Sequence, residues 1–111
     1  MSAPMPVTIS QQQIDDFAAD GAVFLPGLFT DWVAQIRAAI DENMQNPGQY
    51  AAENLAPGDN GRFFDDYCNW QRFDGLGAIL RHSPAAAAAA QLMQSDTVKI
   101  FHDHVLVKEP G

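Results

Sequence analysis

The sequence predicts an α+β fold in a single domain spanning residues 1–111. The chain has 111 residues, 47% of them hydrophobic, which is enough for one core and too few for two. Apolar residues recur at helical spacing over much of the chain, whereas its end, from Thr97 to Lys108, is rich in β-branched residues. Helices packed beside strands of this kind give the α+β class.

A first helix is expected to begin after Ser10. Gln13 follows three residues later, which makes a capping box, and Gly21 supplies the left-handed residue that ends helices at low cost. The short apolar run from Ala22 to Leu25, closed by Pro26-Gly27, then predicts a brief buried strand and a turn.

A second helix is expected from Thr30, whose side chain can serve as its N-cap. One apolar stripe follows at helical spacing, made of Trp32, Val33, Ile36, Ala39, Ile40 and Met44. The helix should end near Asn46-Pro47-Gly48. Residues 47–61 contain three Gly and two Pro among polar residues, which predicts a surface loop.

The middle of the chain is aromatic, with five rings between residues 63 and 73 that either build a core wall or line a pocket. One or two further helical turns are expected over Gly75–Arg81. Ser83-Pro84 then predicts the start of another helix, and the six alanines Ala85–Ala90 favour a close-packed one.

The segment from Thr97 to Lys108 is predicted to be one long strand. Alternation places His102, His104 and Lys108 on one face and Asp103 and the valines at 105 and 107 on the other. Both faces are largely apolar, which is typical of a strand in the middle of a layered sheet. Because residues 1–111 offer no further strands or second layer for it to pack against, the chain is expected to lack the sheet partners of this strand.

The charge of the chain argues against two classes of partner. Six Lys and Arg against fourteen Asp and Glu give a formal net charge of −8, which repels nucleic acid and anionic membrane surfaces. Cys68 is the single cysteine and has no disulfide or zinc spacing. With no secretory signal in the sequence, we expect a cytoplasmic protein.

The His102-Asp103-His104 triplet consists of metal-ligand residue types, but no metal site is assigned to it. Adjacent strand residues point to opposite faces, so Asp103 and the two histidines should not converge on one ion. None of the three histidines has Asp or Glu two residues further on, so the His-x-Asp step of iron oxygenases is absent.

Three stretches, in order, resemble the phytanoyl-CoA dioxygenase family of Fe(II)- and 2-oxoglutarate-dependent oxygenases. They are FAADGAVFLPGLF at 17–29, GRFFDDYCNWQRF at 61–73 and SPAAAAAAQLMQSDTVKIFHDHVLVKEPG at 83–111. The last is the most specific, because in bacterial members a similar strand leads into the His-x-Asp pair.

The resemblance implies the N-terminal helices and first strands of a jelly-roll (double-stranded β-helix) dioxygenase, with the barrel incomplete in residues 1–111. The full-length protein would hold Fe(II) and 2-oxoglutarate and hydroxylate a small organic substrate. This chain alone is expected to be inactive and to bind neither group firmly. Arg62 and Lys108 are candidate 2-oxoglutarate contacts, although Arg62 could be solvated and Lys108 could pair with Glu109.

Two alternatives from other classes stay open. The chain could be a complete, small, non-catalytic helical binding module that pairs its C-terminal strand with a partner by edge addition. It could also be a small metal carrier that uses His102 and His104.

Overall fold

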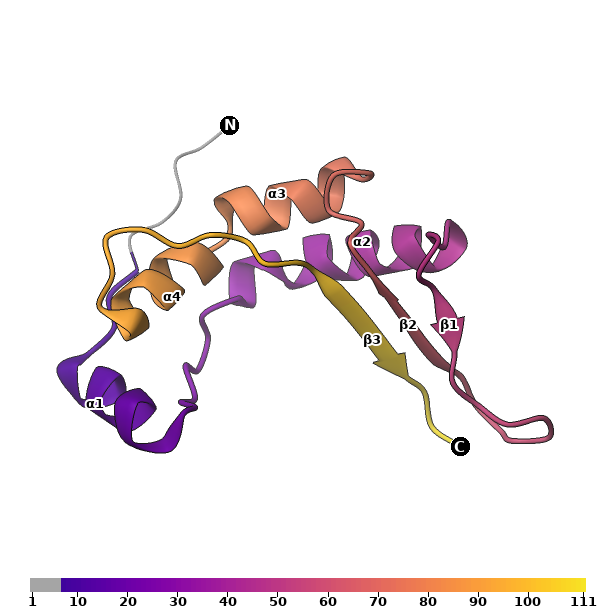
Figure 1. Ribbon diagram of the computed structural model, residues 1–111, viewed down its shortest axis with the longest axis horizontal. Helices are drawn as coiled ribbons and strands as arrows, with labels where there is room; N and C mark the ends of the chain where they lie inside the picture. Colours follow the sequence, from indigo (N-terminus) through magenta and orange to yellow (C-terminus); the bar gives the residue numbers. More distant parts are fainter. Residues whose placement is uncertain (1–6) are drawn as a thin grey trace.

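The computed structural model describes residues 7–111, which form helices and a three-stranded antiparallel sheet arranged along one long axis (Figure 1). At one end, α1 (Gln11–Asp20) packs on α4 (Ala85–Met93). In the middle, α2 (Val33–Gln45) packs on α3 (Asp74–His82). The sheet lies at the other end, alongside α2.

The first helix begins and ends where the sequence predicts. The Ser10 hydroxyl accepts the Gln13 N–H at 3.1 Å, and the Gln13 side chain accepts the Ser10 N–H at 2.9 Å, which completes the capping box. Gly21 ends the helix at φ 75°, the left-handed region in which a side chain would be strained. Both predictions are confirmed.

The strand predicted at Ala22–Leu25 is wrong. These residues form an irregular connection between α1 and the next helical turn, and Phe24 is 81% exposed. A four-residue apolar run becomes a strand only if a partner strand lies beside it, and none of the described strands does.

The second helix is confirmed, but its predicted cap is wrong. Thr30 opens a 3-10 turn, η1 (Thr30–Trp32), and its hydroxyl donates back to the Gly27 carbonyl at 3.1 Å instead of capping the helix. The α-helix proper begins at Val33 and ends at Gln45. Its Ala39 and Asn43 side chains are buried, and the Asn43 amide donates a hydrogen bond to Asp66.

The helices at 74–82 and 85–93 confirm the two predicted for that part of the chain. Ser83 separates them, and its hydroxyl accepts the Ala85 N–H at 3.3 Å. From α4, the Gln91 side chain accepts the Ile9 N–H at 2.9 Å and donates to the Val7 carbonyl at 2.6 Å. These bonds tie the segment before α1 to α4 across more than eighty positions of sequence.

The sheet has the order β1-β2-β3, with β1 at Ala52–Glu53, β2 at Phe63–Tyr67 and β3 at His104–Lys108. Both pairings are antiparallel, and β2 pairs with β3 along its whole length, from Phe63 opposite Lys108 to Tyr67 opposite His104. The predicted loop at 47–61 therefore contains one very short strand.

The prediction of one long strand from Thr97 to Lys108 is wrong for residues 97–103. The partner strand stops at Tyr67, because Cys68 takes a left-handed conformation at φ 63° and turns the chain away. Its N–H still reaches the Asp103 carbonyl at 3.1 Å, but no ladder continues beyond that bond. The expectation that the chain lacks sheet partners is also wrong, because β2 pairs with β3 on one side; the other edge of β3 has no strand beside it among the described residues.

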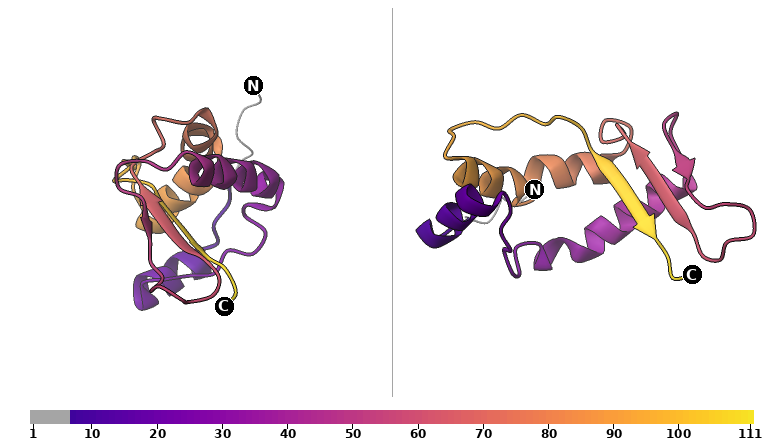
Figure 2. Two further views of the ribbon diagram at one scale, coloured as in Figure 1. Left: turned by 90° about the vertical axis from the view of Figure 1, so that its right-hand side faces the viewer. Right: turned by 60° about the horizontal axis from the view of Figure 1, so that its bottom comes forward.

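The two faces of the sheet have different environments (Figure 2). Phe64, Asp66 and Val105 lie on the covered face and are buried at 1%, 0% and 7% exposure. On the other face, Leu106 is 62% exposed. Of the aromatic segment, Phe64 joins the core, as one of the two alternatives expected, while Phe63 and Tyr67 lie on the uncovered face.

The molecule is elongated for its length. Its radius of gyration is 16.1 Å, whereas a compact domain of this size would have about 13 Å. The buried hydrophobic residues among those described are few and spread along the axis; they are Ile9, Ala39, Phe64, Leu76, Ala88 and Val105. Several large apolar side chains are exposed, among them Phe24, Phe101 and Leu106, and one face of the sheet has no covering layer among the described residues.

Candidate functional site

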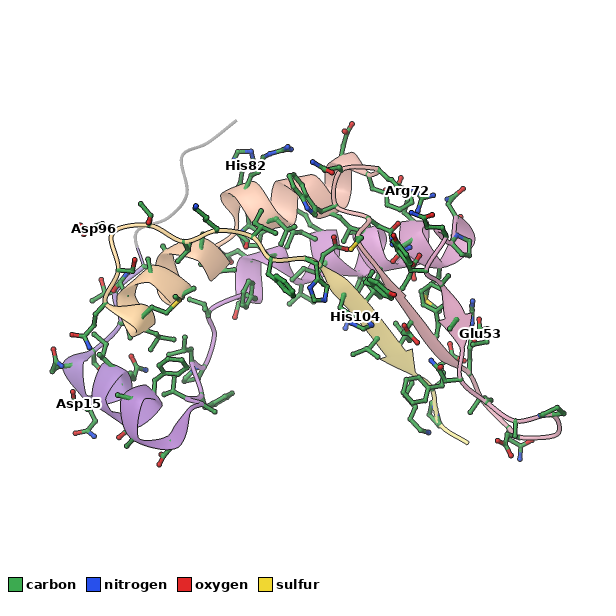
Figure 3. The ribbon with its side chains drawn as sticks, viewed as in Figure 1. Asp15, Glu53, Arg72, His82, Asp96 and His104 are labelled. Carbon is green, nitrogen blue, oxygen red and sulfur yellow. The ribbon has the colours of Figure 1, made fainter. Side chains whose placement is uncertain are left out.

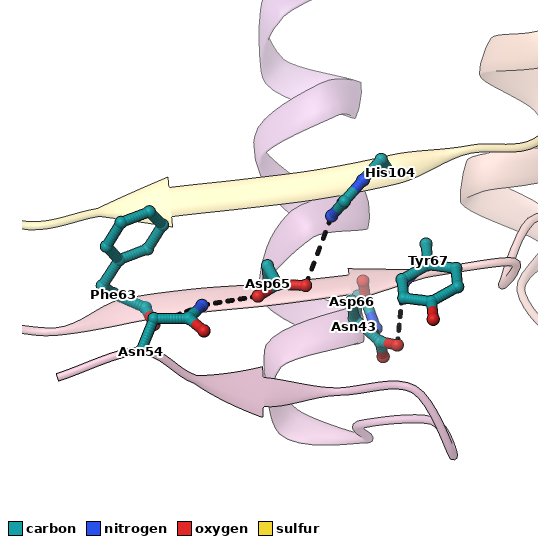
Figure 4. Close-up of polar contacts among 7 residues, drawn as sticks. All are labelled: Asn43, Asn54, Phe63, Asp65, Asp66, Tyr67 and His104. Atoms are coloured by element: carbon teal, nitrogen blue, oxygen red, sulfur yellow. Dashed lines mark hydrogen bonds and ion pairs between the residues drawn. The ribbon is translucent and has the colours of Figure 1, made fainter.

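The uncovered side of the sheet, here called the open face, brings together residues from two distant parts of the chain. Figure 4 shows Asp65, Tyr67 and His104 on the side of the sheet opposite to α2. Strand alternation and register define the whole face as Phe63, Asp65, Tyr67, His104, Leu106 and Lys108.

Aromatic rings gather at one end of the open face. Tyr50, from the loop after α2, stacks on Tyr67 with ring centroids 4.6 Å apart and planes 13° apart. The His102 ring meets Tyr67 edge-on at 6.1 Å, and the His104 ring lies 5.3 Å from it. Phe101 is 92% exposed beside His102. The cluster presents both apolar ring surface and nitrogen and hydroxyl groups.

A carboxylate on β2 holds one of these histidines. Nε2 of His104 lies 3.3 Å from Oδ1 of Asp65, while the other carboxylate oxygen accepts a short hydrogen bond from the Asn54 amide (Figure 4). The Asp65 side chain is 17% exposed and the His104 side chain 38%. A half-buried carboxylate thus fixes the orientation of a reachable imidazole ring.

On the covered face, Asp66 is the centre of a buried polar network. Its carboxylate accepts the Asn43 amide at 3.0 Å, the Gly48 N–H at 2.7 Å and the Tyr67 N–H at 2.8 Å. Asp65 and Asp66 are neighbours that point to opposite faces of the sheet, and Asp66 is 0% exposed.

These contacts favour the ionised form of Asp66. Burial alone would raise its pKa, but the Gly48 N–H, the Asn43 amide, the nearby Asn69 amide and the Tyr67 N–H outweigh burial and hold its pKa below the ordinary value of 3.8. The Asn69 amide contributes by proximity, because its Nδ2 group completes no hydrogen bond among the described residues. Asp66 is therefore a buried anion that joins α2, the loop after it and β2.

Asp103 occupies a similar structural role at the end of the sheet. Its side chain accepts the Asn69 N–H at 3.0 and 3.1 Å and the Trp70 N–H at 3.0 Å, and the residue is 9% exposed. The prediction that Asp103 points away from His102 and His104 is confirmed, since both histidines are exposed.

The two candidate 2-oxoglutarate contacts lie on different sides of the sheet. The Arg62 guanidinium bonds Glu53 at 2.7 Å and lies 5.2 Å above the Phe64 ring, on the covered side. Lys108, opposite Phe63, belongs to the open face and is exposed, with no carboxylate at ion-pair distance among the described residues. The structure does not bring Arg62 and Lys108 together.

A shallow groove between α2 and α3 has a volume of about 330 Å³. Small or uncharged side chains line it, with Glu42 as the one ionisable group, and its floor includes Ala39 and Gly75. It has no convergent set of polar groups, so the open face is the better candidate for chemistry.

The described residues do not fit the iron site that the resemblance implies. Within residues 7–111, no group of three or more His, Cys, Asp or Glu side chains is arranged to hold a metal ion. His82 is on α3, away from the sheet strands, and Asp103 is engaged by backbone N–H groups.

Comparison with known proteins gives no relative: no family model, curated protein or solved structure matches this chain. Among the described residues, none of the helices has both the length and the apolar content to cross a bilayer. The fold and site together define an α+β domain with one open, polar and aromatic sheet face.

The sequence did not point to three residues of this site: Tyr50, which stacks on Tyr67, Asp65, which bonds His104, and Asn54, which bonds Asp65. Alternation along 63–67 could have placed Asp65 on the face of Tyr67. No local signal could have placed His104 beside Asp65, because these two residues are 39 positions apart and only the β2–β3 register brings them together.

Proposed function

We propose that this chain is the N-terminal part of an Fe(II)- and 2-oxoglutarate-dependent oxygenase similar to phytanoyl-CoA dioxygenases. In this proposal, the open face is one wall of the pocket in which a small organic substrate is hydroxylated. The observation that carries it is the uncovered sheet face, which presents Lys108, His104 and Tyr67 on the same side. The choice of this enzyme family comes from the three sequence stretches that resemble it, which occur in the family's order.

The exposure of apolar side chains supports a covering layer. Leu106 is 62% exposed on the open face, and Ile100 and Phe101, in the segment leading to β3, are 45% and 92% exposed. Antiparallel sheets often leave one face to water, but these three exposed apolar side chains are surface that a covering layer would bury. A jelly roll supplies the missing layer as a second sheet, and β3 has a free edge among the described residues on which it could extend.

Lys108 is the better of the two candidate contacts for 2-oxoglutarate. It is exposed on the open face, where an ammonium group would form charge-assisted hydrogen bonds with a dicarboxylate. Arg62 already has the Glu53 carboxylate and lies on the other side of the sheet. We place the enzyme in the cytoplasm, acting on a small molecule rather than on nucleic acid or membrane lipid.

The metal ligands of such an enzyme are absent from residues 1–111, so two results are expected. The isolated chain should show no 2-oxoglutarate-dependent oxygen consumption in an oxygen electrode with Fe(II) and ascorbate. Any coding sequence continuing past Gly111 should contain a His-x-Asp or His-x-Glu step within about twenty residues. Turnover by the isolated chain, or a continuation without that step, would refute the proposal.

The chain offers a matched control for the role of Lys108, because Lys99 and Lys108 are its two lysines. In the extended protein, Lys108→Ala should raise the KM for 2-oxoglutarate by at least about tenfold, the equivalent of one charge-assisted hydrogen bond. Lys99→Ala, which removes an exposed lysine before β3, should leave it unchanged. Equal effects of the two substitutions on this KM would show that Lys108 does not contact 2-oxoglutarate.

The free edge of β3 favours a second candidate, a non-catalytic module that binds an extended partner strand. The backbone groups of His104–Lys108 that point away from β2 have no strand partner among the described residues. Protection of these amides from hydrogen exchange by a partner, in a chain with a natural stop after Gly111, would favour this candidate over the oxygenase.

A further inference from the structure

We propose that His102 and His104 form a binding site for a late first-row divalent metal ion of the zinc, nickel or copper class, with Asp65 as the carboxylate that orients His104. This site is distinct from the His-x-Asp…His iron site that the resemblance implies, and it does not rest on the proposed oxygenase function.

The first support is the placement of the two imidazole rings. Residues two apart on an extended chain point to the same side, and the His102 and His104 rings have centroids 6.0 Å apart with planes at 48°. Both residues are exposed, so their nitrogen lone pairs can reach an ion without opening the core. Figure 3 shows His104 at the start of β3, near the middle of the molecule.

The ring separation is close to that of two ligands on one ion. Zinc–nitrogen bonds of about 2.1 Å at a tetrahedral angle put two imidazole centroids about 5 Å apart. The observed 6.0 Å therefore has to close by about 1 Å, which small rotations about the χ angles of exposed side chains supply.

The second support is the carboxylate behind His104. With Asp65 Oδ1 at 3.3 Å from Nε2, the ring is placed to donate its Nε2–H to the carboxylate, which leaves the Nδ1 lone pair for a metal ion. Asn54 holds the other oxygen of Asp65. A carboxylate that orients a metal-binding imidazole and raises its basicity is the usual outer shell of histidine metal sites.

Other potential ligands near the pair are already engaged. Asp103, between the two histidines in sequence, is turned to the covered side and accepts the N–H groups of Asn69 and Trp70. Because residues 7–111 offer no cluster of three metal-binding side chains, the remaining coordination positions would be open to water or to a ligand. Two imidazoles favour zinc, nickel and copper over magnesium or calcium, which prefer oxygen ligands.

The test is calorimetric titration of the full chain with Zn²⁺ and with Ni²⁺ at pH 7.5 in a non-coordinating buffer. The expected result is saturable binding of one ion per chain. His102→Ala and His104→Ala should each lower the affinity at least about tenfold, and Asp65→Asn, which keeps the shape but removes the charge, should lower it about 10- to 100-fold.

Two matched controls separate this site from other donors. His82→Ala removes the third histidine, on α3, and Cys68→Ser removes the thiol. Both should keep wild-type affinity. The proposal is overturned if wild-type shows no saturable binding, if the His102→Ala/His104→Ala double variant binds as wild-type does, or if either control abolishes binding.

Folding of each variant is checked without metal by far-UV circular dichroism and thermal unfolding. The two histidines are exposed, so their replacement should leave the apo-protein folded. Addition of Zn²⁺ should raise the unfolding temperature of wild-type and of the two control variants and leave that of the double variant unchanged. This readout requires no 2-oxoglutarate turnover, so failure here and failure of the proposed oxygenase function are told apart.

Discussion

The carboxylate of Asp103 accepts the backbone N–H of Asn69 across 34 positions of sequence, at 3.0 Å from Oδ1 and 3.1 Å from Oδ2. This bond joins the segment before β3 to the turn after β2. It also sets the sense of β3, because a buried residue 103 puts Val105 on the covered side and His102 and His104 on the open side.

Asp103→Ala should lower the free energy of unfolding by about 2–3 kcal/mol, because it leaves two N–H groups in a buried turn without their charged acceptor. Urea unfolding followed by circular dichroism measures this value. Asp103→Asn keeps one acceptor oxygen and should cost about half as much. His102→Ala, at the neighbouring exposed position, is the control and should change stability by less than about 0.5 kcal/mol.

Asp66→Asn should destabilise the protein by about 2–4 kcal/mol at pH 7, because an amide in place of the carboxylate sets its own N–H groups against those of Gly48 and Asn43. Since the folded-state pKa of Asp66 lies below 3.8, the stabilisation from its charge is complete above about pH 5 and is lost as the pH falls through that lower value.

The stability of wild-type should therefore fall towards that of Asp66→Asn below pH 3.8, and urea unfolding at stepwise lower pH measures the difference. Asp59→Asn, in the exposed loop, is a control that keeps the core network intact. A constant difference between wild-type and Asp66→Asn from pH 7 to pH 2.5 would contradict the buried-anion assignment.

Gly48→Ala should cost about 1–3 kcal/mol. An added Cβ would lie 2.6 Å from Oδ1 of Asn69 and 2.9 Å from Nη1 of Arg72, inside the Asp66 network. Gly75→Ala is the matched control, because its Cβ would meet Ala39 at 3.4 Å, an ordinary contact, and alanine favours the helix. The thermal unfolding temperature of Gly48→Ala should therefore fall, whereas that of Gly75→Ala should rise or stay unchanged.

Cys68→Gly should raise the free energy of unfolding by up to about 1 kcal/mol, because a residue other than glycine is strained at φ 63°. The side chain is exposed, so little packing is lost. Cys68→Ala removes the thiol but keeps the strain and should give no gain. If both variants gain stability equally, the thiol and not the backbone conformation is responsible.

The local signals in the sequence determined the helices. The capping box at Ser10, the Gly21 stop, the apolar stripe of the second helix and the alanine run after Pro84 all act within one or two helical turns. Alternation likewise determined that His102 and His104 share a side and that Asp103 does not join them.

Only the tertiary structure decided where strands form, which face is open and what the charged side chains meet. A strand needs a partner, so Ala22–Leu25 and residues 97–103 stayed irregular despite their composition. Asp65 and Asp66 are neighbours of the same type, yet they have different partners. The β2–β3 register places Asp65 beside His104, and the packing of α2 places Asn43 beside Asp66. The physical reason is that hydrogen bonding between strands and burial depend on residues far apart in the chain, which no local pattern records.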